Sequence, residues 1–365
     1  MSSGFVSYAR TTVVFGPGTL ATLGSHAKSL GFSRPYLVAD AGMVRAGYVA
    51  RAQRILESEA ISSLLFSNFS ENPKSDEIER GKDFALHFAP DSIVALGGGS
   101  SLDCAKAINF LLAQGGRIQD YWGYDKATCP LLPMIGVPTT TGTGSEAQSY
   151  ALISDAETHV KMAIGAPSAA FRMVILDPEL AVSQPRSVLA TAGYDAISHA
   201  VETAATTRRN LASIALAREA WCLLSANFER LLNDPWDIDA AGQMQYGAYL
   251  AGSAIEHSML GAAHATANPL TATYGLTHGL AIALMLVPVV NLNGIECYSA
   301  LDGFSVSRLE SLAQSAGLPR RLRDLAVPLH DLEALAVAAA QQWTGRFNPR
   351  PFDVDVARRI YECAF

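Results

Sequence analysis

The chain has 365 residues, with 27 basic and 34 acidic side chains and a net charge of -7. Because it is acidic and has no cluster of Lys or Arg, we expect no binding to nucleic acid or to an anionic membrane. Apolar residues make up 49% and charged residues 17%, which favours a globular protein with a large core. The length exceeds what one core usually supports, so two domains are expected.

Targeting signals are not evident in the sequence. The longest apolar run, residues 280–290, is too short to span a bilayer, and the N-terminus lacks a charged region followed by an apolar one. Five scattered cysteines without a CxxC pair favour a reducing compartment, and they argue against a thiolate metal site or a catalytic cysteine. These features predict a cytoplasmic protein.

Strand and helix patterns alternate in the first half of the chain. Strands are expected at 35–39, 61–66, 92–96 and 131–137, with helices at 19–30, 44–57, 75–87 and 101–112 and further short strands at 149–154, 162–164 and 173–176. Thr19 is expected to cap the first helix. This alternation predicts a parallel sheet covered on both faces, whereas the Ala- and Leu-rich chain from about residue 186 onward predicts helices.

Polar segments follow three of the expected strands, where parallel sheets collect ligands. Gly97-Gly98-Gly99-Ser100 and the loop Pro138–Glu146 carry glycines and hydroxyls that suit a pyrophosphate, although each also fits an ordinary turn. The glycine motif is neither the spaced Rossmann fingerprint nor a Walker loop. Asp40 fits two roles: a partner for an adenosine ribose, which favours NAD over NADP, or a cap for the next helix.

Histidines are scarce and gather in the second half of the chain. Asp195 and His199 are four residues apart, on one face of an expected helix, and His264 and His278 follow. One carboxylate and three imidazoles suit divalent iron or zinc and leave a position open for a substrate oxygen. Each histidine alone also fits a core position, and spacing does not decide between the two.

Taken together, these segments resemble the iron-containing (group III) metal-dependent alcohol dehydrogenase family over nearly the whole chain. The matching segments, in chain order, are Phe15–Gly18, Val38–Asp40, Asn72-Pro73, Gly97–Ser100 with Asp103, Pro138–Glu146, Asp155–Lys161, Asp177-Pro178, Asp195 with His199, His264, Thr277–Gly279 and Asn348–Pro351. The resemblance implies a dehydroquinate synthase-like architecture. An α/β NAD-binding domain with a parallel sheet would occupy residues 1–180, and an all-α metal-binding catalytic domain residues 181–365.

The resemblance also implies the site residues. The metal ligands are Asp195, His199, His264 and His278, a complete set that separates the chain from relatives resembling maleylacetate reductase. The cofactor-binding positions are Asp40, Asn72, Gly98, Gly99, Ser100, Asp103, Thr139, Thr140, Thr143, Ser145 and Lys161. The implied cofactors are NAD and Fe(II) or Zn(II), and the implied assembly is a homodimer or a higher homo-oligomer.

Two positions depart from the family pattern. Asn268 stands where the family carries a histidine assigned to proton relay or nicotinamide contact, and His257 stands where relatives have a small or amide residue. An amide forms hydrogen bonds but does not shuttle a proton near neutral pH. The two residues are eleven apart, close to three helical turns, which predicts a shared helical face.

The predicted reaction is reversible hydride transfer between a small primary alcohol and NAD, with the metal ion activating the alcohol oxygen. One alternative is a lyase resembling 3-dehydroquinate synthase. Its expected metal ligands include a glutamate, and Asp195 in this chain argues against it. A relative resembling maleylacetate reductase is a second alternative. A non-catalytic NAD-binding protein is a third, suggested only by Asn268.

Overall fold

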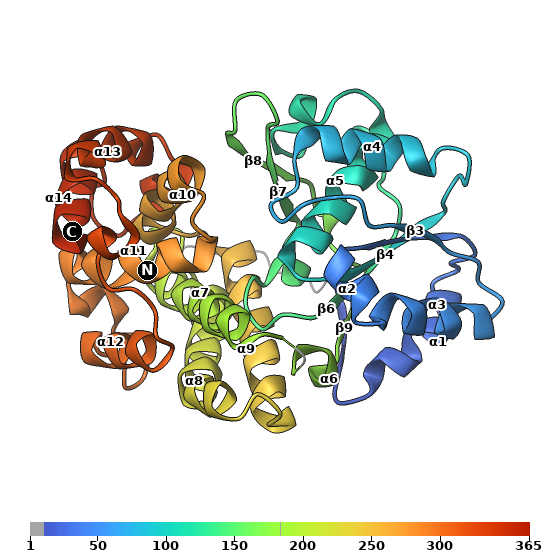
Figure 1. Ribbon diagram of the computed structural model, residues 1–365, viewed down its shortest axis with the longest axis horizontal. Helices are drawn as coiled ribbons and strands as arrows, with labels where there is room; N and C mark the ends of the chain where they lie inside the picture. Colours follow the sequence, from blue (N-terminus) through green and yellow to red (C-terminus); the bar gives the residue numbers. More distant parts are fainter. Residues whose placement is uncertain (1–10, 183) are drawn as a thin grey trace. The chain divides into compact units, whose positions relative to one another are not determined.

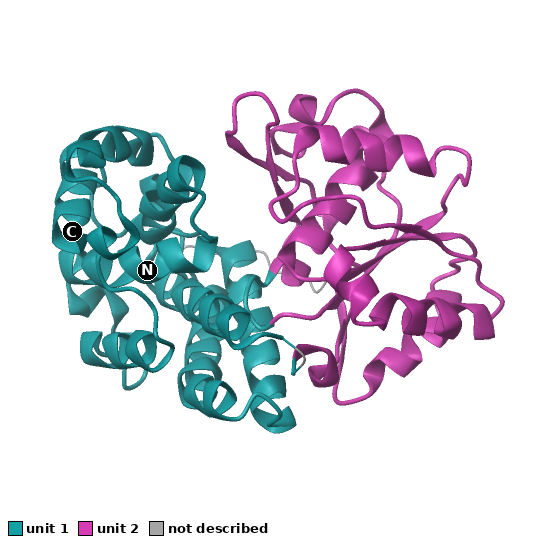
Figure 2. Ribbon diagram, viewed as in Figure 1, with its two compact units in different colours: residues 1–7, 141–144, 182–365 teal, residues 8–140, 145–181 magenta. Residues whose placement is uncertain are grey.

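The computed structural model describes residues 11–182 and 184–365. These residues form two compact units, coloured differently in Figure 2. The unit drawn in magenta, here called the sheet unit, takes the described residues through Thr140 together with Ser145–Ala181. The unit drawn in teal, the helical unit, takes Thr141–Gly144 and the described part of Val182–Phe365. The predicted fold class, a parallel α/β sheet followed by helices, is confirmed.

A six-stranded parallel sheet forms the centre of the sheet unit (Figure 1). Its strand order is β1-β9-β6-β4-β2-β3. The strands are β1 Thr12–Phe15, β2 Pro35–Ala39, β3 Leu64–Phe66, β4 Ser92–Gly97, β6 Met134–Pro138 and β9 Met173–Leu176. The inner strands β2, β4, β6 and β9 are buried along their whole length, because they are apolar at nearly every position and helices cover both faces.

Helices lie on both sides of this sheet, with α4 and α5 on one side and α1 and α3 on the other (Figure 1). The helices are α1 Leu23–Ser29, α2 Ala41–Arg45, α3 Tyr48–Ser58, α4 Ser75–Ala85, α5 Gly99–Gln114 and α6 Pro178–Ala181, with 3-10 turns η1 Thr19–Thr22, η2 Ile118–Tyr121, η3 Ser145–Ala147 and η4 Pro167–Ala169. Alternate strand residues such as Leu37 and Ala39 join Leu23 and Leu56 in one buried apolar cluster.

A second, smaller sheet accounts for two of the expected short strands. It has the order β5-β8-β7, with β5 at Gly123–Tyr124, β7 at Tyr150–Ser154 and β8 at Lys161–Gly165. Strands β7 and β8 are antiparallel, whereas the third expected short strand is β9 of the main sheet. The sequence predicted these strands but gave no indication that they belong to separate sheets.

Several expected boundaries are wrong for local reasons. The helix expected at 44–57 is two helices, α2 and α3, because Gly47 has a left-handed backbone with φ +79°. Thr19 does not cap the first helix, since the turn begins after Gly18 and the Thr19 hydroxyl donates to the Gly16 carbonyl at 2.7 Å. The strand expected from Leu131 begins at Met134, because the Asn109 amide pairs with both backbone groups of Leu132.

The register of the main sheet brings the predicted ligand-binding segments to one edge. Ala39 pairs with Leu96, and Gly97 pairs with Pro138. Strands β2, β4 and β6 therefore end side by side, and Asp40, Gly98 and Thr139 are the residues that follow them.

The helical unit is built around α7 Arg186–Ala205, which packs against α8, α9 and α11. Its other helices are α8 Leu211–Asn233, α9 Ile238–His257, α10 Ala262–Tyr274, α11 His278–Asn293, α12 Val306–Ser315, α13 Leu332–Ala340 and α14 Val354–Ala364, with 3-10 turns η5 Ile295–Tyr298, η6 Leu322–Leu325, η7 Leu329–Asp331 and η8 Trp343–Phe347. Helix α7 is buried at every position from Gly193 to Ala205, and its many small residues let the neighbouring helices approach closely.

The segment Thr141–Gly144 packs against α7 and α9 within the helical unit. A Cβ atom on Gly142 would lie 2.5 Å from the Ala192 carbonyl oxygen, and one on Gly252 would lie 2.3 Å from the Gly144 carbonyl oxygen. Gly144 also has a left-handed backbone, with φ +61°. Backbone therefore meets backbone here, and no larger residue fits at these positions.

Across the described residues, no helix has both the length and the apolar character that crossing a membrane requires.

Candidate functional site

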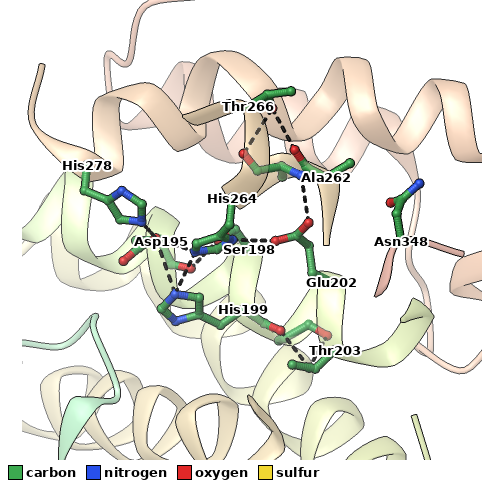
Figure 3. A network of polar contacts seen from close by, with 12 residues as sticks. Asp195, Ser198, His199, Glu202, Thr203, Ala262, His264, Thr266, His278 and Asn348 are labelled. Atoms are coloured by element: carbon green, nitrogen blue, oxygen red, sulfur yellow. Dashed lines mark hydrogen bonds and ion pairs between the residues drawn. The ribbon is translucent and has the colours of Figure 1, made fainter. Parts of the chain in front are cut away.

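One face of α7 carries three ionisable side chains at successive turns, Asp195, His199 and Glu202 (Figure 3). The spacings of four and three residues place them in a row along the helix. All three are buried. Because α7 is itself enclosed by other helices, this row faces the interior of the helical unit rather than solvent.

Two further histidines from other helices complete a cluster around Asp195. His264 lies in the first turn of α10, and His278 is the first residue of α11. The Asp195 Oδ1 atom is 3.5 Å from His199 Nε2, 3.7 Å from His264 Nε2 and 3.7 Å from His278 Nε2. The Nε2 atoms of His199 and His264 are 3.1 Å apart. Three imidazole nitrogens therefore converge on one carboxylate oxygen (Figure 3).

These distances fit a bound metal ion. Ligand atoms lie about 2.0–2.2 Å from a tetrahedral divalent ion, which separates them from one another by about 3.3–3.6 Å. The observed separations of 3.1 to 3.7 Å lie close to that range. One carboxylate and neutral imidazoles are also donors that divalent iron and zinc accept. Asp195, His199 and His264 form the group whose ligand atoms all lie within 4.8 Å of one another, whereas His278 lies outside that group and approaches Asp195.

Burial keeps at least one imidazole in the form that a metal ion requires. The pKa of His199 falls to about 4, chiefly because burial disfavours the charged ring, and the nearby Asp195 carboxylate only partly opposes this effect. A neutral ring keeps a lone pair on one nitrogen. His199 is therefore ready to act as a ligand near neutral pH.

The two residues that depart from the family pattern lie on different helices. His257 is the last residue of α9, and its Nδ1 atom lies 2.8 Å from the Ser253 carbonyl oxygen. Asn268 lies within α10 and donates to Gln342 Oε1 at 3.1 Å. The expectation of a shared helical face is wrong, because the chain leaves α9 after His257 and starts α10 only after Gly261.

In the sheet unit, Asp40 makes the contacts of a helix cap. Its Oδ1 atom accepts from the backbone N–H groups of Gly42 and Met43 at 2.8 and 3.2 Å, which caps α2. Its Oδ2 atom accepts from the Ser101 hydroxyl at 3.0 Å. The capping role that the sequence left open is therefore present in the structure, and the carboxylate is held at the edge of the sheet.

The glycine motif starts α5 without a side-chain cap. Gly98 is the N-cap residue of this 16-residue helix, and no side chain caps it. Gly97 has φ +146°, and a Cβ atom there would lie 2.3 Å from Ser101 Oγ. The uncapped helix start and the bare backbone form a cradle for an anion such as a diphosphate. Thr139 supports this fit, because its buried hydroxyl has no hydrogen-bond partner within the described chain.

The other predicted cofactor residues are spread over both units. Asn72, with φ +56°, donates its N–H to Ser100 Oγ at 3.3 Å. Gly99 opens α5, Thr140 lies beside Gly98, and Thr143 belongs to the segment that packs in the helical unit. Lys161 is the first residue of β8, and its positive charge opposes the rise in the pKa of Asp103.

Asp103 and Ser145 form a hydrogen-bonded network with a buried lysine. Ser145 Oγ donates to Asp103 Oδ1 at 2.5 Å, and Lys106 Nζ donates to Ser145 Oγ at 3.1 Å and to the Ser145 carbonyl at 2.7 Å. Asp103 Oδ2 also accepts from the Leu152 N–H at 3.0 Å. Burial raises the pKa of Asp103, against the effect of the Lys106 charge. This network fixes the end of the loop that contains Ser145.

Sequence reasoning missed Glu202 and Lys106. Glu202 continues the row of Asp195 and His199 along the same helix, so the helical period was a signal that could have found it. Lys106 interrupts the apolar run between Ala105 and Ala107, which is unusual for a lysine on a buried helix face.

A parallel sheet with an anion cradle, and a cluster of one carboxylate and three imidazoles, are typical of a metal-dependent, dinucleotide-linked enzyme. Residues 10–178 match the family described as iron-containing alcohol dehydrogenase, and residues 189–365 match the C-terminal part of the Fe-containing alcohol dehydrogenase family.

Individual relatives agree over nearly the full chain. Alcohol dehydrogenase 4 of Schizosaccharomyces pombe is 31% identical, over 96% of this chain and 87% of the relative. The NAD-dependent methanol dehydrogenase of Bacillus methanolicus is 29% identical, over 95% of this chain and 96% of the relative. A crystal structure of 1,3-propanediol oxidoreductase superposes with a TM-score of 0.95 at 29% identity, over 100% of both chains.

The chain therefore belongs to the iron-containing alcohol dehydrogenase family, as the sequence motifs predicted. The family and these relatives support an NAD-linked alcohol oxidoreductase that carries a divalent metal ion.

Proposed function

We propose that the protein interconverts a small primary alcohol and its aldehyde by reversible hydride transfer to and from NAD. The observation that carries the proposal is the convergence of three imidazole Nε2 atoms on Asp195 Oδ1, at 3.5 to 3.7 Å. With all four protein ligands bound, a substrate oxygen would take the fifth position of an ion that expands from four to five ligands.

Asp195, His199, His264 and His278 are the residues that would hold the ion. When bound, a divalent ion supplies a Lewis acid for the alcohol oxygen and NAD supplies the hydride acceptor. The ligand set suits both Fe(II) and Zn(II). The low pKa of His199, about 4, keeps that ring neutral near neutral pH.

The sheet edge supplies the features that NAD binding needs. The start of α5 at Gly98 offers backbone N–H groups and the positive end of a helix to a diphosphate. Asp40 is held at the end of β2, where its carboxylate would pair with a ribose hydroxyl and repel an added phosphate. For this reason we propose NAD rather than NADP as the cofactor.

Residue 268 would not carry the proton away from the substrate in the proposed reaction. Asn268 has an amide where relatives resembling this chain carry a histidine, and an amide does not take up a proton near neutral pH. Its Nδ2 atom already donates to Gln342.

The resemblance further implies a homodimer or higher homo-oligomer, and the scattered cysteines favour the cytoplasm; we include both in the proposal. Sedimentation velocity at several protein concentrations measures the oligomeric state directly. A monomer at every concentration would contradict the proposed homo-oligomer.

The deciding experiment is a metal analysis followed by an activity assay. Protein purified without added metal is stripped with a chelator, reloaded with Fe(II) or Zn(II), and assayed by NADH absorbance over a panel of short primary alcohols and aldehydes. We expect turnover only in reloaded samples and with NAD in preference to NADP. Turnover that persists in stripped protein, or no NADH change with any substrate, would overturn the proposal in favour of a metal-independent or a non-catalytic NAD-binding protein.

A further inference from the structure

A single buried carboxylate links two helices next to the histidine cluster. Glu202 extends from α7 to the first turn of α10, where its Oε1 atom accepts from the Ala263 N–H at 2.8 Å. Its Oε2 atom contacts His264 Nδ1 (Figure 3). The side chain is buried, so water does not compete for either oxygen. Glu202 therefore binds the backbone of α10 and the histidine that this helix carries.

This contact bears on which nitrogen of His264 carries the proton. A carboxylate oxygen accepts hydrogen bonds, so the contact favours the tautomer in which Nδ1 is the donor. In the neutral ring, Nε2 then keeps its lone pair. That atom lies 3.1 Å from His199 Nε2 and 3.7 Å from Asp195 Oδ1, inside the cluster.

We propose that Glu202 is a positioning residue that fixes the tautomer and the orientation of His264 for metal binding. The inference rests on the proposed function, because it assumes that the cluster holds a metal ion. Outer carboxylates that accept from the second nitrogen of a metal-binding imidazole orient the ring and increase its basicity. In this chain the same carboxylate also stabilises the N-terminus of the helix that bears the histidine.

The local chain is adapted to a group that accepts two hydrogen bonds at once. The Ala263 N–H and the His264 Nδ1 atom, the two donors in the proposed tautomer, face the two oxygens of Glu202. A glutamine has one oxygen and one NH₂ group. Its oxygen accepts from one of these donors, and its NH₂ group cannot accept from the other. Gly261 is also part of the arrangement, because a Cβ atom there would lie only 3.0 Å from Glu202 Oε1.

The first test measures metal affinity in the full-length, metal-free protein. Zn²⁺ is titrated against a chromophoric chelator in the presence of wild type, Glu202→Gln and the control Glu229→Gln. Glu229 lies on α8 and accepts from Arg308 and Ser315, so the control removes one hydrogen-bonded carboxylate of the same unit that does not contact the histidine cluster. We expect Glu202→Gln to raise the Kd for Zn²⁺ about 10- to 100-fold. The control should change it less than about twofold, as a surface substitution usually does.

The second test reads the tautomer of His264 by ¹⁵N NMR of the imidazoles in metal-free protein, with the resonance assigned by its loss in His264→Gln. Wild type should carry the proton on Nδ1, and Glu202→Gln should move it to Nε2. A wild-type ring protonated on Nε2 alone would overturn the inference, even if the variant failed to fold. An unchanged Kd in a folded Glu202→Gln would also overturn it. The proposed function fails in a different way, namely if wild type binds no metal.

Discussion

The backbone N–H of Asp40 donates to Ser101 Oγ at 3.2 Å, and the same hydroxyl donates back to Asp40 Oδ2 at 3.0 Å. These two hydrogen bonds connect the end of strand β2 to the first turn of α5, the helix that starts at the glycine motif. Asp40 Oδ1 caps α2 at the same time. One side chain therefore organises the sheet edge at which we propose that NAD binds.

The charge and the capping role of Asp40 can be separated by two substitutions. Asparagine is as good an N-cap as aspartate, so Asp40→Asn should keep thermal stability while it removes the negative charge. We expect its preference for NAD over NADP, measured as the ratio of kcat/KM values, to fall at least about fivefold, since a charge repulsion near a protein surface is worth about 1–4 kcal/mol.

Asp40→Ala serves as the comparison, because it removes both the charge and the cap. It should lose the same preference and in addition about 1 kcal/mol of unfolding free energy. An unchanged cofactor preference in both variants would show that Asp40 acts only as a cap.

His278→Ala removes one of the four proposed ligands. We expect kcat/KM to fall about a thousandfold or more, because the charge stabilisation supplied by a metal ion is worth several kcal/mol. The Kd for NAD, from fluorescence titration, should stay within about twofold because His278 is not among the cofactor positions. His330→Ala is the control, since His330 is exposed and lies in the 3-10 turn η7. Full activity in His278→Ala would contradict the ligand assignment.

Asn268→His introduces an imidazole at the position where the family pattern carries a histidine. We expect a new ionisation, near the usual histidine pKa of about 6.5, in the pH profile of kcat/KM. Asn268→Ala controls for loss of the hydrogen bond to Gln342 without adding a titratable group. If all three profiles have the same shape, residue 268 does not govern proton release.

Glu146 gives the sheet unit a pH-dependent stability. Burial raises the pKa of this carboxyl from 4.5 to about 7, although Lys106 opposes the shift. Between these values the folded chain holds a proton that the unfolded chain releases, so the free energy of unfolding should fall as the pH rises from about 4.5 to about 7 and then level off.

Glu146→Gln removes this dependence. Relative to wild type, the variant should gain about 2–3 kcal/mol more unfolding free energy at pH 8 than at pH 5, which urea unfolding at the two values measures. Glu157→Gln is the control, because Glu157 is exposed. An equal difference between Glu146→Gln and wild type at both values would mean that Glu146 ionises at its ordinary pKa.

The sequence predicted the sheet edge well, for a geometric reason. Parallel strands end on the same side, so Asp40, Gly98 and Thr139 could be placed together from strand positions alone. The pairing of Asp195 with His199 followed equally from the helical period. In these cases local structure determines which residues meet.

What the sequence did not reveal depends on packing between elements. His264 and His278 join the cluster because α10 and α11 pack against each other and α11 packs against α7, and only the family resemblance indicated this beforehand. The break of the helix at Gly47 and the separation of His257 from Asn268 depend on loop conformations that periodicity does not report. Buried networks such as that of Lys106 have the same origin.

The glycine contacts of Thr141–Gly144 also determine which part of the gene encodes a complete helical unit. Because these four residues complete the packing of the helical unit, that unit is not encoded by one continuous stretch of sequence. A protein encoded by a gene fragment that starts after Ala181 would lack Gly144, against which the backbone of α9 packs at Gly252. During synthesis the missing piece emerges from the ribosome before α7. A recombination event that exchanges the first half of the chain must therefore supply a compatible glycine segment for the second.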